Sequence, residues 1–403
     1  MTAPTVPDAR PRERSEREVI AYLAFMGILM AFGVDAALPA FDDLRSAFDL
    51  AADSNSISLT VTLYLIGLAI GQLAVGPLAD RYGRVLTLRL GIGLYSLGAL
   101  GSIVSPDLTW LLISRAVWGV GAAAPGALRT TVARDLYSGA QMARVVSIAS
   151  GFFMMGPVIA PIVGQGILAI SSWQWVFGAS LILAAVLGVW TMRFGETLEP
   201  ADRRAIDAAG IVAGFRAVLA NRQTLGYTLA LTFGFGAFFV FLGSSHPIID
   251  DIYGRGDQFA LWFGLASVAM AVSFFSVNRF IVRRGAHRTA VVTASAAVAL
   301  SLVLTALSIA GDGVPSFAVW LGFIAVINAL TTLLTPTCYS LGLEPMGALA
   351  GTASGVMGFV STAGGSLLAA AIDASIDGSV TPMAVAYAGY VSLALVSMRW
   401  ARA

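Results

Sequence analysis

Twelve stretches of about twenty mostly apolar residues recur along the chain, and this repeated length constrains the fold more than any other feature. An α-helix needs about 20 apolar residues to cross the roughly 30 Å hydrocarbon core of a membrane. Each stretch therefore predicts one transmembrane helix, and the fold class is an all-α membrane protein. The predicted spans are 19–39, 57–78, 86–104, 108–131, 145–168, 173–193, 224–246, 259–281, 288–310, 315–338, 349–372 and 380–399.

The composition agrees with a membrane protein and excludes several kinds of partner. Of the 403 residues 57% are hydrophobic and 12% are charged, where a soluble domain carries about 25% charge. A net charge of +1 gives no reason to expect a nucleic-acid partner. Cys338 is the only cysteine, so no intrachain disulfide or thiolate metal cluster can form. We expect no metal and no cofactor.

The positions of the arginines predict the orientation, because positive charge accumulates on the cytoplasmic side of a membrane. All 24 basic residues are arginines, and 21 of them fall on one side if the N-terminus is inside. Arg45 and Arg255 lie outside, and Arg115 lies within a span. Both termini are therefore predicted to be cytoplasmic. The inner arginines are 10, 12, 14, 17, 81, 84, 89, 129, 134, 144, 193, 203, 204, 216, 222, 279, 283, 284, 288, 399 and 402.

The longest charged interruption divides the spans six and six. We assign residues 1–18 to a disordered cytoplasmic tail, 19–193 and 224–403 to two six-helix bundles, and 194–223 to a central cytoplasmic loop. The alternative for the N-terminus is a signal peptide that begins at Val19, but the apolar run is long for one.

Two pairs of segments indicate that the halves are repeats. "IASGFF" at 148–153 matches "TASGVM" at 352–357, and "DRYGR" at 80–84 matches "VRRGA" at 282–286, at offsets of 204 and 202. Parallel repeats with a substrate site between them near the bilayer midplane are typical of alternating-access transporters. Chance similarity between apolar segments is the competing explanation.

Several motifs lie in the first half of the chain. "GPLADRYGR" at 76–84 is similar to the signature loop between helices 2 and 3 of the major facilitator superfamily. "SRAVWGVGAAA" at 114–124 and "RDLYSGAQMAR" at 134–144 resemble the fourth helix and the loop after it in drug exporters. "MMGPVIAPIVGQG" at 154–166 resembles the antiporter motif of helix 5 in Bcr/CflA-type multidrug exporters, in the drug:proton antiporter branch.

The sequence also departs from that pattern at two positions. Trp118 stands where relatives usually carry Gln, and Gly27 lies at a depth where some multidrug members have a second acid. Both changes affect the expected range of drugs.

The resemblance implies a conformational latch at the inner loops, where opposite charges of neighbouring helices can meet and hold one of two arrangements. Ordinary positive-inside topology is the alternative, but it gives no reason for Asp80. The latch residues are Gly76, Asp80, Arg81, Gly83, Arg84, Arg134 and Asp135.

The resemblance also implies that helix 5 takes part in the antiport cycle. Its prolines each remove a helix hydrogen bond, and its small residues allow close approach of another helix. Glycine and proline are common in membrane helices, so packing alone is the alternative. The motif residues are Gly156, Pro157, Ala160, Pro161 and Gly164.

Asp35 and Arg115 are the two charges that lie clearly inside a span, at about 6 and 10 Å from the outer ends of their helices. Desolvation favours a neutral acid and a nearby arginine favours a carboxylate, so a site that alternates between the two can carry a proton. We predict that Asp35 is the proton carrier and Arg115 its electrostatic partner. If Pro39 ends the helix, however, Asp35 is nearly wet and serves as a surface acid. Arg129 lies 40° from the face of Arg115 at 100° per residue, which favours a positive stripe toward the cavity.

The remaining candidates would line an apolar and aromatic cavity, which favours lipophilic ligands over sugars. These residues are Tyr64, Gln72, Phe152, Tyr227, Phe238 and Asn328. Packing within the bundle is the alternative for any single aromatic residue among them. His246, before Pro247, is expected in an outer turn.

The predicted function is a proton-coupled antiporter of the inner membrane that exports small lipophilic or cationic compounds by alternating access and acts as a monomer. Its partners would be the substrate, protons and the lipid bilayer. The alternative is a carrier dedicated to one metabolite or antibiotic, because fold does not determine function. An enzyme is not expected: HExxH and GxSxG motifs are absent, and no Walker lysine is possible without lysine. A sensor that does not transport is a more distant alternative.

Overall fold

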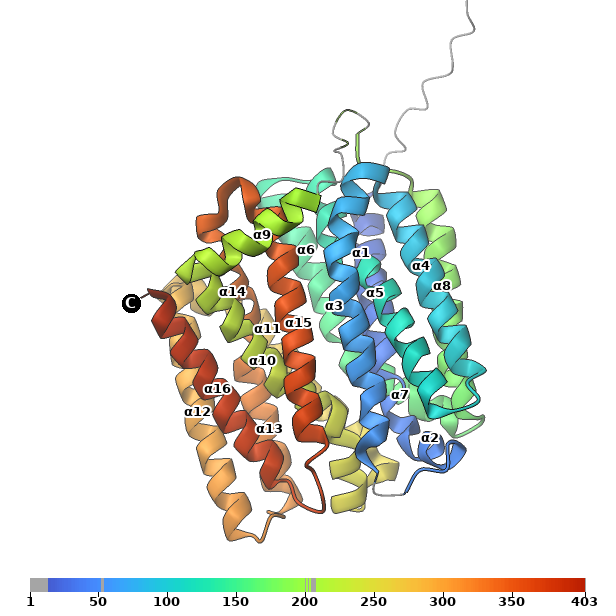
Figure 1. Ribbon diagram of the computed structural model, residues 1–403, viewed down its shortest axis with the longest axis vertical. Helices are drawn as coiled ribbons and strands as arrows, with labels where there is room; N and C mark the ends of the chain where they lie inside the picture. Colours follow the sequence, from blue (N-terminus) through green and yellow to red (C-terminus); the bar gives the residue numbers. More distant parts are fainter. Residues whose placement is uncertain (1–13, 52–53, 200, 202, 204–207, 403) are drawn as a thin grey trace, which may run out of the picture.

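The computed structural model describes residues 14–51, 54–199, 201, 203 and 208–402, and its regular structure over these residues is entirely helical (Figure 1). Twelve segments in this part of the chain are long and apolar enough to cross a membrane, which confirms the twelve predicted spans. Their bounds are Glu16–Ala47, Asn55–Tyr82, Arg84–Ile103, Leu108–Leu136, Arg144–Leu168, Trp173–Phe194, Arg222–Ile252, Gly256–Ser276, Ala286–Ala310, Phe317–Gly347, Ala350–Asp373 and Thr381–Arg402.

The helices form two groups, which we call the N-half and the C-half, and Figure 1 shows the blue-to-green N-half beside the yellow-to-red C-half. The N-half contains α1 (Glu16–Asp35), η1 (Leu38–Ala40), α2 (Phe41–Ala47), η2 (Asn55–Ser58), α3 (Leu59–Tyr82), α4 (Arg84–Ile103), α5 (Leu108–Leu136), α6 (Gly139–Met154), α7 (Gly156–Leu168) and α8 (Trp173–Phe194). After the connecting helix α9 (Ala208–Ala220), the C-half contains α10 (Arg222–Pro247), η4 (Ile248–Ile252), η5 (Gly256–Gln258), α11 (Phe259–Arg284), α12 (Ala286–Ala310), α13 (Phe317–Thr332), α14 (Leu334–Leu343), η6 (Glu344–Leu349), α15 (Ala350–Asp373) and α16 (Thr381–Arg402).

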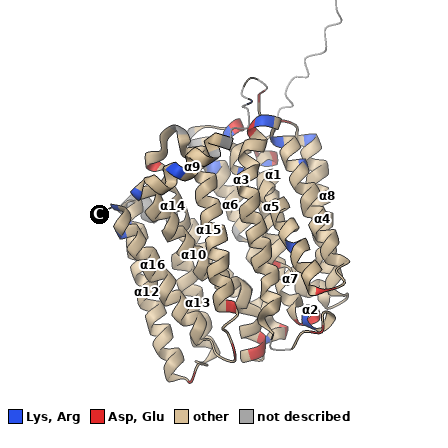
Figure 2. Ribbon diagram, viewed as in Figure 1, with Lys and Arg blue, Asp and Glu red and all other residues tan. Residues whose placement is uncertain are grey.

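The bundle has two ends. We call the end where α1 begins at Glu16 and α16 ends at Arg402 the terminal face, and the other end, where α1 ends, the opposite face. Figure 2 shows the charged residues gathered near these two ends, with few between them. This distribution is expected of helices whose middle parts lie in hydrocarbon.

Polar side chains fix several helix starts. Ser15 accepts a hydrogen bond from the backbone N–H of Glu18 at 3.2 Å, so α1 begins inside the predicted tail. Arg14, also assigned to that tail, donates to the carbonyl of Phe194 at 2.9 Å. Residues 1–13 of the predicted tail, with Arg10 and Arg12, lie outside the described residues.

The central connection is partly helical. Residues 194–223 are predicted to be a loop, but α9 occupies Ala208–Ala220 and α10 already begins at Arg222. The segment has apolar residues at helical spacing and packs against α15, which accounts for the helix.

Proline interrupts three of the spans. Helix α1 ends at Asp35 and continues through η1, which contains Pro39, into α2. The fifth span breaks at Met155, just before Pro157, and the tenth breaks at Leu333, shortly before Pro336. A proline lacks the N–H that would bond to the preceding turn, which explains the breaks.

Two structural details support the repeat. Gly83 joins α3 to α4 with φ of +99°, and Gly285, 202 residues later, joins α11 to α12 with φ of +78°. Gly151 on α6 and Gly355 on α15, which are 204 residues apart, each face the other half. A Cβ at Gly151 would lie 2.4 Å from the Phe275 ring, and one at Gly355 would lie 3.9 Å from the Gln72 carbonyl oxygen.

Hydrogen bonds between the halves occur only at the opposite face within the described part of the chain. The Ser58 hydroxyl donates to the carbonyl of Gly243 at 2.9 Å, and the Asn55 amide donates to the carbonyl of Ile376. The Gln165 side chain accepts from the N–H of Ala260, the second residue of α11, at 3.2 Å. The halves are therefore tied together at the opposite face.

Candidate functional site

Asp35 is the last residue of α1, and its side chain is buried with 4% exposure. The sequence left two outcomes for Pro39, and the structure combines them: the helix ends, but the Asp35 side chain stays buried. Leu38 and Ala40 of η1 are themselves buried and hold the following turn over the end of α1. No hydrogen bond or ion pair to the Asp35 carboxylate occurs among the residues that the structure describes.

Arg115 is fully buried in α5 beside the end of α1. Its Nη1 donates to the carbonyl oxygen of Gly33 at 2.7 Å, and its Nε donates to that of Thr60 at 3.1 Å. Its guanidinium also lies 4.8 Å from the ring centre of Tyr64. Arg115 therefore bonds to the backbone two residues before Asp35, with no ion pair to the carboxylate itself, and its Nη2 has no partner in the described chain.

The helix 5 motif packs against the segment that carries Asp35. A Cβ at Gly164 would lie 2.2 Å from the carbonyl oxygen of Ala36, and one at Gly156 would lie 2.6 Å from the Ala31 Cβ. Only residues without a side chain allow α7 to approach α1 and η1 so closely. Pro157 lies at the start of α7, after the break, and Pro161 and Ala160 are buried within it. The motif thus places both a helix break and a close contact next to Asp35.

The predicted latch residues meet at the terminal face. Arg84 Nη1 donates to Asp80 Oδ1 at 2.7 Å, and Arg84 Nε donates to Asp135 Oδ2 at 2.8 Å, so one guanidinium joins α3, α4 and α5. Arg81 and Arg134 are exposed, and a Cβ at Gly76 would meet no atom within 4 Å. The network lies within the N-half, and no described residue of the C-half bonds to it.

Glu196 completes this network, and sequence reasoning missed it. Its Oε1 accepts from the N–H of Arg84 at 2.9 Å and its Oε2 from that of Val85 at 3.2 Å, so the carboxylate caps α4. A Cβ at Gly83 would lie 2.3 Å from Glu196 Oε2, which explains why glycine is needed there in addition to its positive φ. The only signal available was an acid just after the sixth span.

A second charged network joins the halves at the opposite face and had no signal in the sequence. Arg45 in α2 is buried, and its Nη1 and Nη2 donate to the two carboxylate oxygens of Asp251 at 3.1 and 2.9 Å. Its Nη1 also donates to Asp42 at 3.1 Å. His246 was expected in an outer turn, but that prediction is wrong: it lies in α10 and is buried, because the helix continues to Pro247.

The same region contains the cluster of side chains most able to hold a metal ion. Ligand atoms of Asp42, His246 and Asp250 lie within 4.8 Å of one another. Arg45 already supplies positive charge to Asp42, so an ion-pair network accounts for the acids without a metal.

Two of the predicted cavity residues, Tyr64 and Tyr227, form hydrogen bonds within their own halves. The Tyr64 hydroxyl donates to the carbonyl of Met30 at 3.0 Å, and the Tyr227 hydroxyl lies 2.8 Å from Nδ1 of His287. Both tyrosine side chains are fully buried. Each therefore packs within a half.

The other four predicted cavity residues keep free polar atoms or exposed rings. Gln72 Oε1 and Asn328 Nδ2 are buried without a partner among the described residues, although Asn328 Oδ1 accepts from Tyr387. The Phe152 ring is half exposed, and Phe238 is partly buried.

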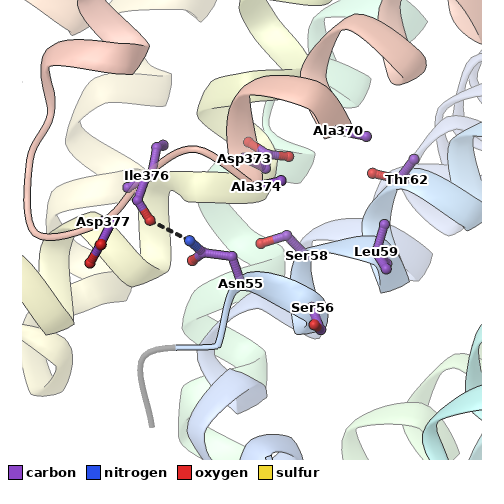
Figure 3. A pocket seen from close by; sticks show the side chains of 10 residues that line it. All are labelled: Asn55, Ser56, Ser58, Leu59, Thr62, Ala370, Asp373, Ala374, Ile376 and Asp377. Carbon is purple, nitrogen blue, oxygen red and sulfur yellow. Dashed lines mark hydrogen bonds between the residues drawn. The ribbon is translucent and has the colours of Figure 1, made fainter. Parts of the chain in front are cut away.

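A polar cavity of about 400 Å³ opens between the halves at the opposite face (Figure 3). Asn55, Ser58 and Thr62 line it from the N-half, and Asp373 and Asp377 line it from the C-half. Asp373 is buried and accepts a hydrogen bond from Ser244. This acid, at the end of the eleventh span, is the C-half counterpart of Asp35 in chemistry, although it has a partner.

Comparison with known proteins agrees with this architecture. The family model described as "Major Facilitator Superfamily" matches residues 23–369. The chain belongs to the major facilitator superfamily. A member of this superfamily with twelve apolar helices is a multi-pass transporter of the inner membrane.

Curated relatives include proteins named for drug resistance. A bicyclomycin resistance protein homolog of Haemophilus influenzae is 31% identical over 382 residues, covering 92% of this chain and 93% of its own. The multidrug resistance protein MdtL of Escherichia fergusonii is 26% identical and 84% of each chain is covered. The predicted resemblance to Bcr/CflA-type exporters is confirmed at these modest identities.

Solved structures show the same fold. A D-xylose-proton symporter superposes with a TM-score of 0.76 at 18% identity, covering 96% of this chain and 98% of the symporter. The transporter FucP in an outward conformation gives a TM-score of 0.67 at 17% identity, with 97% of this chain and 100% of FucP covered. At such identities the likeness concerns the fold alone.

Proposed function

We propose that this superfamily transporter is a proton-coupled antiporter that exports small lipophilic compounds by alternating access. The observation that carries the proposal is Asp35, a buried carboxylate without a bonding partner in the described chain, packed beside the helix 5 motif. An ionised group deep in a membrane protein costs about 3 kcal/mol or more, so a dry carboxylate favours the protonated form. Exposure to water, or an approach of Arg115, favours release of the proton.

The orientation follows from the arginines. We propose that the terminal face is cytoplasmic and that residues 19–193 and 224–403 move as two bodies joined by the segment 194–223. Bonds between the halves at the opposite face would then close the outer side. Asp35 would then be closed off from the outer side until the halves separate.

The helix 5 motif supplies a route from the proton to the movement. Gly164 touches the carbonyl next to Asp35, and the following residue, Gln165, bonds to the first turn of α11 in the other half. A shift of Asp35 on gaining or losing a proton would therefore be passed to the contact between the halves. Arg115, which holds the end of α1, would limit that shift.

The charge network around Arg84 is proposed to act as the latch of the other state. It is already assembled within the N-half, with Asp80, Asp135 and Glu196 as partners. When the terminal face closes, the exposed Arg81 and Arg134 would be available to the C-half.

The relatives favour export of foreign compounds over uptake. Two of them carry resistance to drugs in their names. The sequence also allowed cationic substrates and, as an alternative, a carrier dedicated to one antibiotic or metabolite. We expect the protein to act as a monomer.

The test is proton release from energised everted vesicles that contain the protein. Adding a transported drug should dissipate the pH gradient, and Asp35→Asn should abolish this response while the protein remains folded. Asp43→Asn, which changes an exposed acid in α2, is the matched control and should respond as the wild type does. An Asp35→Asn protein that still exchanges drug for protons would show that Asp35 is not the proton carrier. A response to a single compound from a diverse panel would favour a dedicated carrier.

A further inference from the structure

Arg129, near the end of the predicted span 108–131, places two guanidinium nitrogens inside the bundle. A Cβ built at Gly27 would lie 2.7 Å from Arg129 Nη1, so the arginine lies directly against the backbone of α1. Gly27 is eleven residues into α1, which corresponds to about 16 Å from the terminal end of that helix. The positive charge is therefore well below the terminal face.

The direction of the side chain explains this depth. Side chains on an α-helix lean toward the helix N-terminus. Helix α5 begins at Leu108 on the opposite face, so Arg129 extends away from the terminal face instead of reaching back to it. Snorkelling to the terminal surface does not account for its position.

No counter-charge reaches this guanidinium among the described residues. Nε and Nη1 of Arg129 are both buried and have no hydrogen-bond partner among the described residues. The guanidinium carbon lies 4.8 Å from the centre of the Phe153 ring, a cation–π contact. The three described arginines whose side chains are buried, unlike the partly exposed Arg129, all have partners. Arg84 and Arg45 each bond to two carboxylates, and Arg115 bonds to two carbonyls.

We infer that Arg129 binds the anionic group of the transported compound, so that the substrate is an amphipathic organic acid. This inference rests on the proposed export function and narrows its substrate class. A buried guanidinium presents a planar set of donors that matches a carboxylate, and an unpaired one gains most from such a ligand. An organic acid replaces the cationic substrates expected from the sequence, because the positive charge of Arg129 would repel a cation.

The surroundings fit an aromatic body beside the acid. Phe153 and the half-exposed Phe152 lie on α6, and the exposed Phe275 reaches Gly151 of the same helix from the C-half. Phe153 is the ring that faces Arg129, whereas Gly151, where Phe275 packs, points about 160° away from Phe153 around α6 at 100° per residue. An aryl group bound at Arg129 would therefore stack on Phe153.

The same oxyanion chemistry is found in the headgroup of an anionic lipid, and the experiment must separate the two sources. The assay is equilibrium binding to the full-length protein in nanodiscs, with empty nanodiscs subtracted. The probes are 2-naphthoate, 2-naphthamide and 2-naphthylmethylammonium, which share one ring system and differ in charge, followed by a panel of other aryl carboxylates. Nanodiscs of phosphatidylcholine alone and with added phosphatidylglycerol form the two lipid arms.

In phosphatidylcholine the wild type should bind naphthoate at least tenfold more tightly than the amide or the ammonium. Arg129→Gln should lose this preference, and Arg129→Lys should keep part of it. Arg144→Gln, which alters an exposed arginine of α6, is the control and should bind as the wild type does. Thermal unfolding of each variant checks its fold, and naphthoate should raise the melting temperature of the wild type but not of Arg129→Gln.

Three results would overturn the inference: no acid of the panel binds to the wild type, the ammonium binds most tightly, or Arg129→Gln binds naphthoate unchanged. Strong loss of naphthoate binding when phosphatidylglycerol is added, only in proteins with Arg129, would assign the site to lipid and also overturn it. The assay needs no proton gradient, so its outcome is independent of antiport. Acid binding without proton exchange would refute the proposed function alone.

Discussion

Replacing Asp251 by asparagine should open the opposite face. Arg45 is 3% exposed and bonds to both carboxylate oxygens of Asp251, at 2.9 and 3.1 Å. Each hydrogen bond to a charged group contributes about 1.5–3 kcal/mol, but the Asp251 side chain is 31% exposed, so water replaces part of the loss. We expect the closed arrangement to lose about 2 kcal/mol, which changes the ratio of closed to open molecules about 30-fold.

The measurement is double electron–electron resonance on spin-labelled full-length protein in nanodiscs. Spin labels at Ser46 of the N-half and Ser375 of the C-half, both exposed at the opposite face, report the separation of the halves there. Asp251→Asn should add a population at longer distance. Asp43→Asn is the matched control, because it removes an exposed acid from the same helix that forms no ion pair with a described residue. The reasoning fails if Asp251→Asn leaves the distances unchanged, or if Asp43→Asn changes them equally.

Three further substitutions test other contacts. Gly164→Ala should abolish transport, because the new methyl group meets the backbone oxygen of Ala36, and this overpacking should also lower the free energy of unfolding by about 1–3 kcal/mol. Transport assays and thermal unfolding measure the two effects, and normal transport would contradict the prediction. Gly83→Ala should cost about 1–3 kcal/mol, since φ of +99° suits glycine and the methyl group would displace Glu196; an unchanged melting temperature would refute this. Arg84→Gln should cost about 2 kcal/mol by leaving the Asp135 charge with only the Thr197 hydroxyl as a partner, as measured by chemical unfolding, and unchanged stability would count against the latch network.

The twelve spans were predictable because a helix in hydrocarbon must satisfy its own backbone and needs a fixed length to do so. Asp80 and Arg84 were expected to meet because they are four residues apart, but Gly83 ends α3 between them, so the turn and not one continuous helix brings them together. Local spacing therefore predicted the elements, whereas the turn at Gly83 makes this contact.

Contacts that depend on distant parts of the chain were not predictable. Arg45 and Asp251 are 206 residues apart, and no local pattern relates them. The burial of Asp35 depends on how η1 folds over the end of α1, which is a matter of tertiary packing. For Arg129, the helical angle predicted which face of the helix it lies on. The depth of its charge depends on the direction of the side chain and on the space left by Gly27.

The paired glycines at the contact between the halves restrict how those halves can move. The ring of Phe275 fits into the notch at Gly151, where even one added carbon would lie 2.4 Å from it. Sliding along the helix axes would drive that ring into the side chains next to the notch, whereas rotation about it would not. The contact at Gly355 is looser, since a Cβ there would lie at an ordinary 3.9 Å from the carbonyl oxygen of Gln72 on α3. The fit of Phe275 at Gly151 therefore favours rocking of one half about the α6–α11 contact over sliding along it.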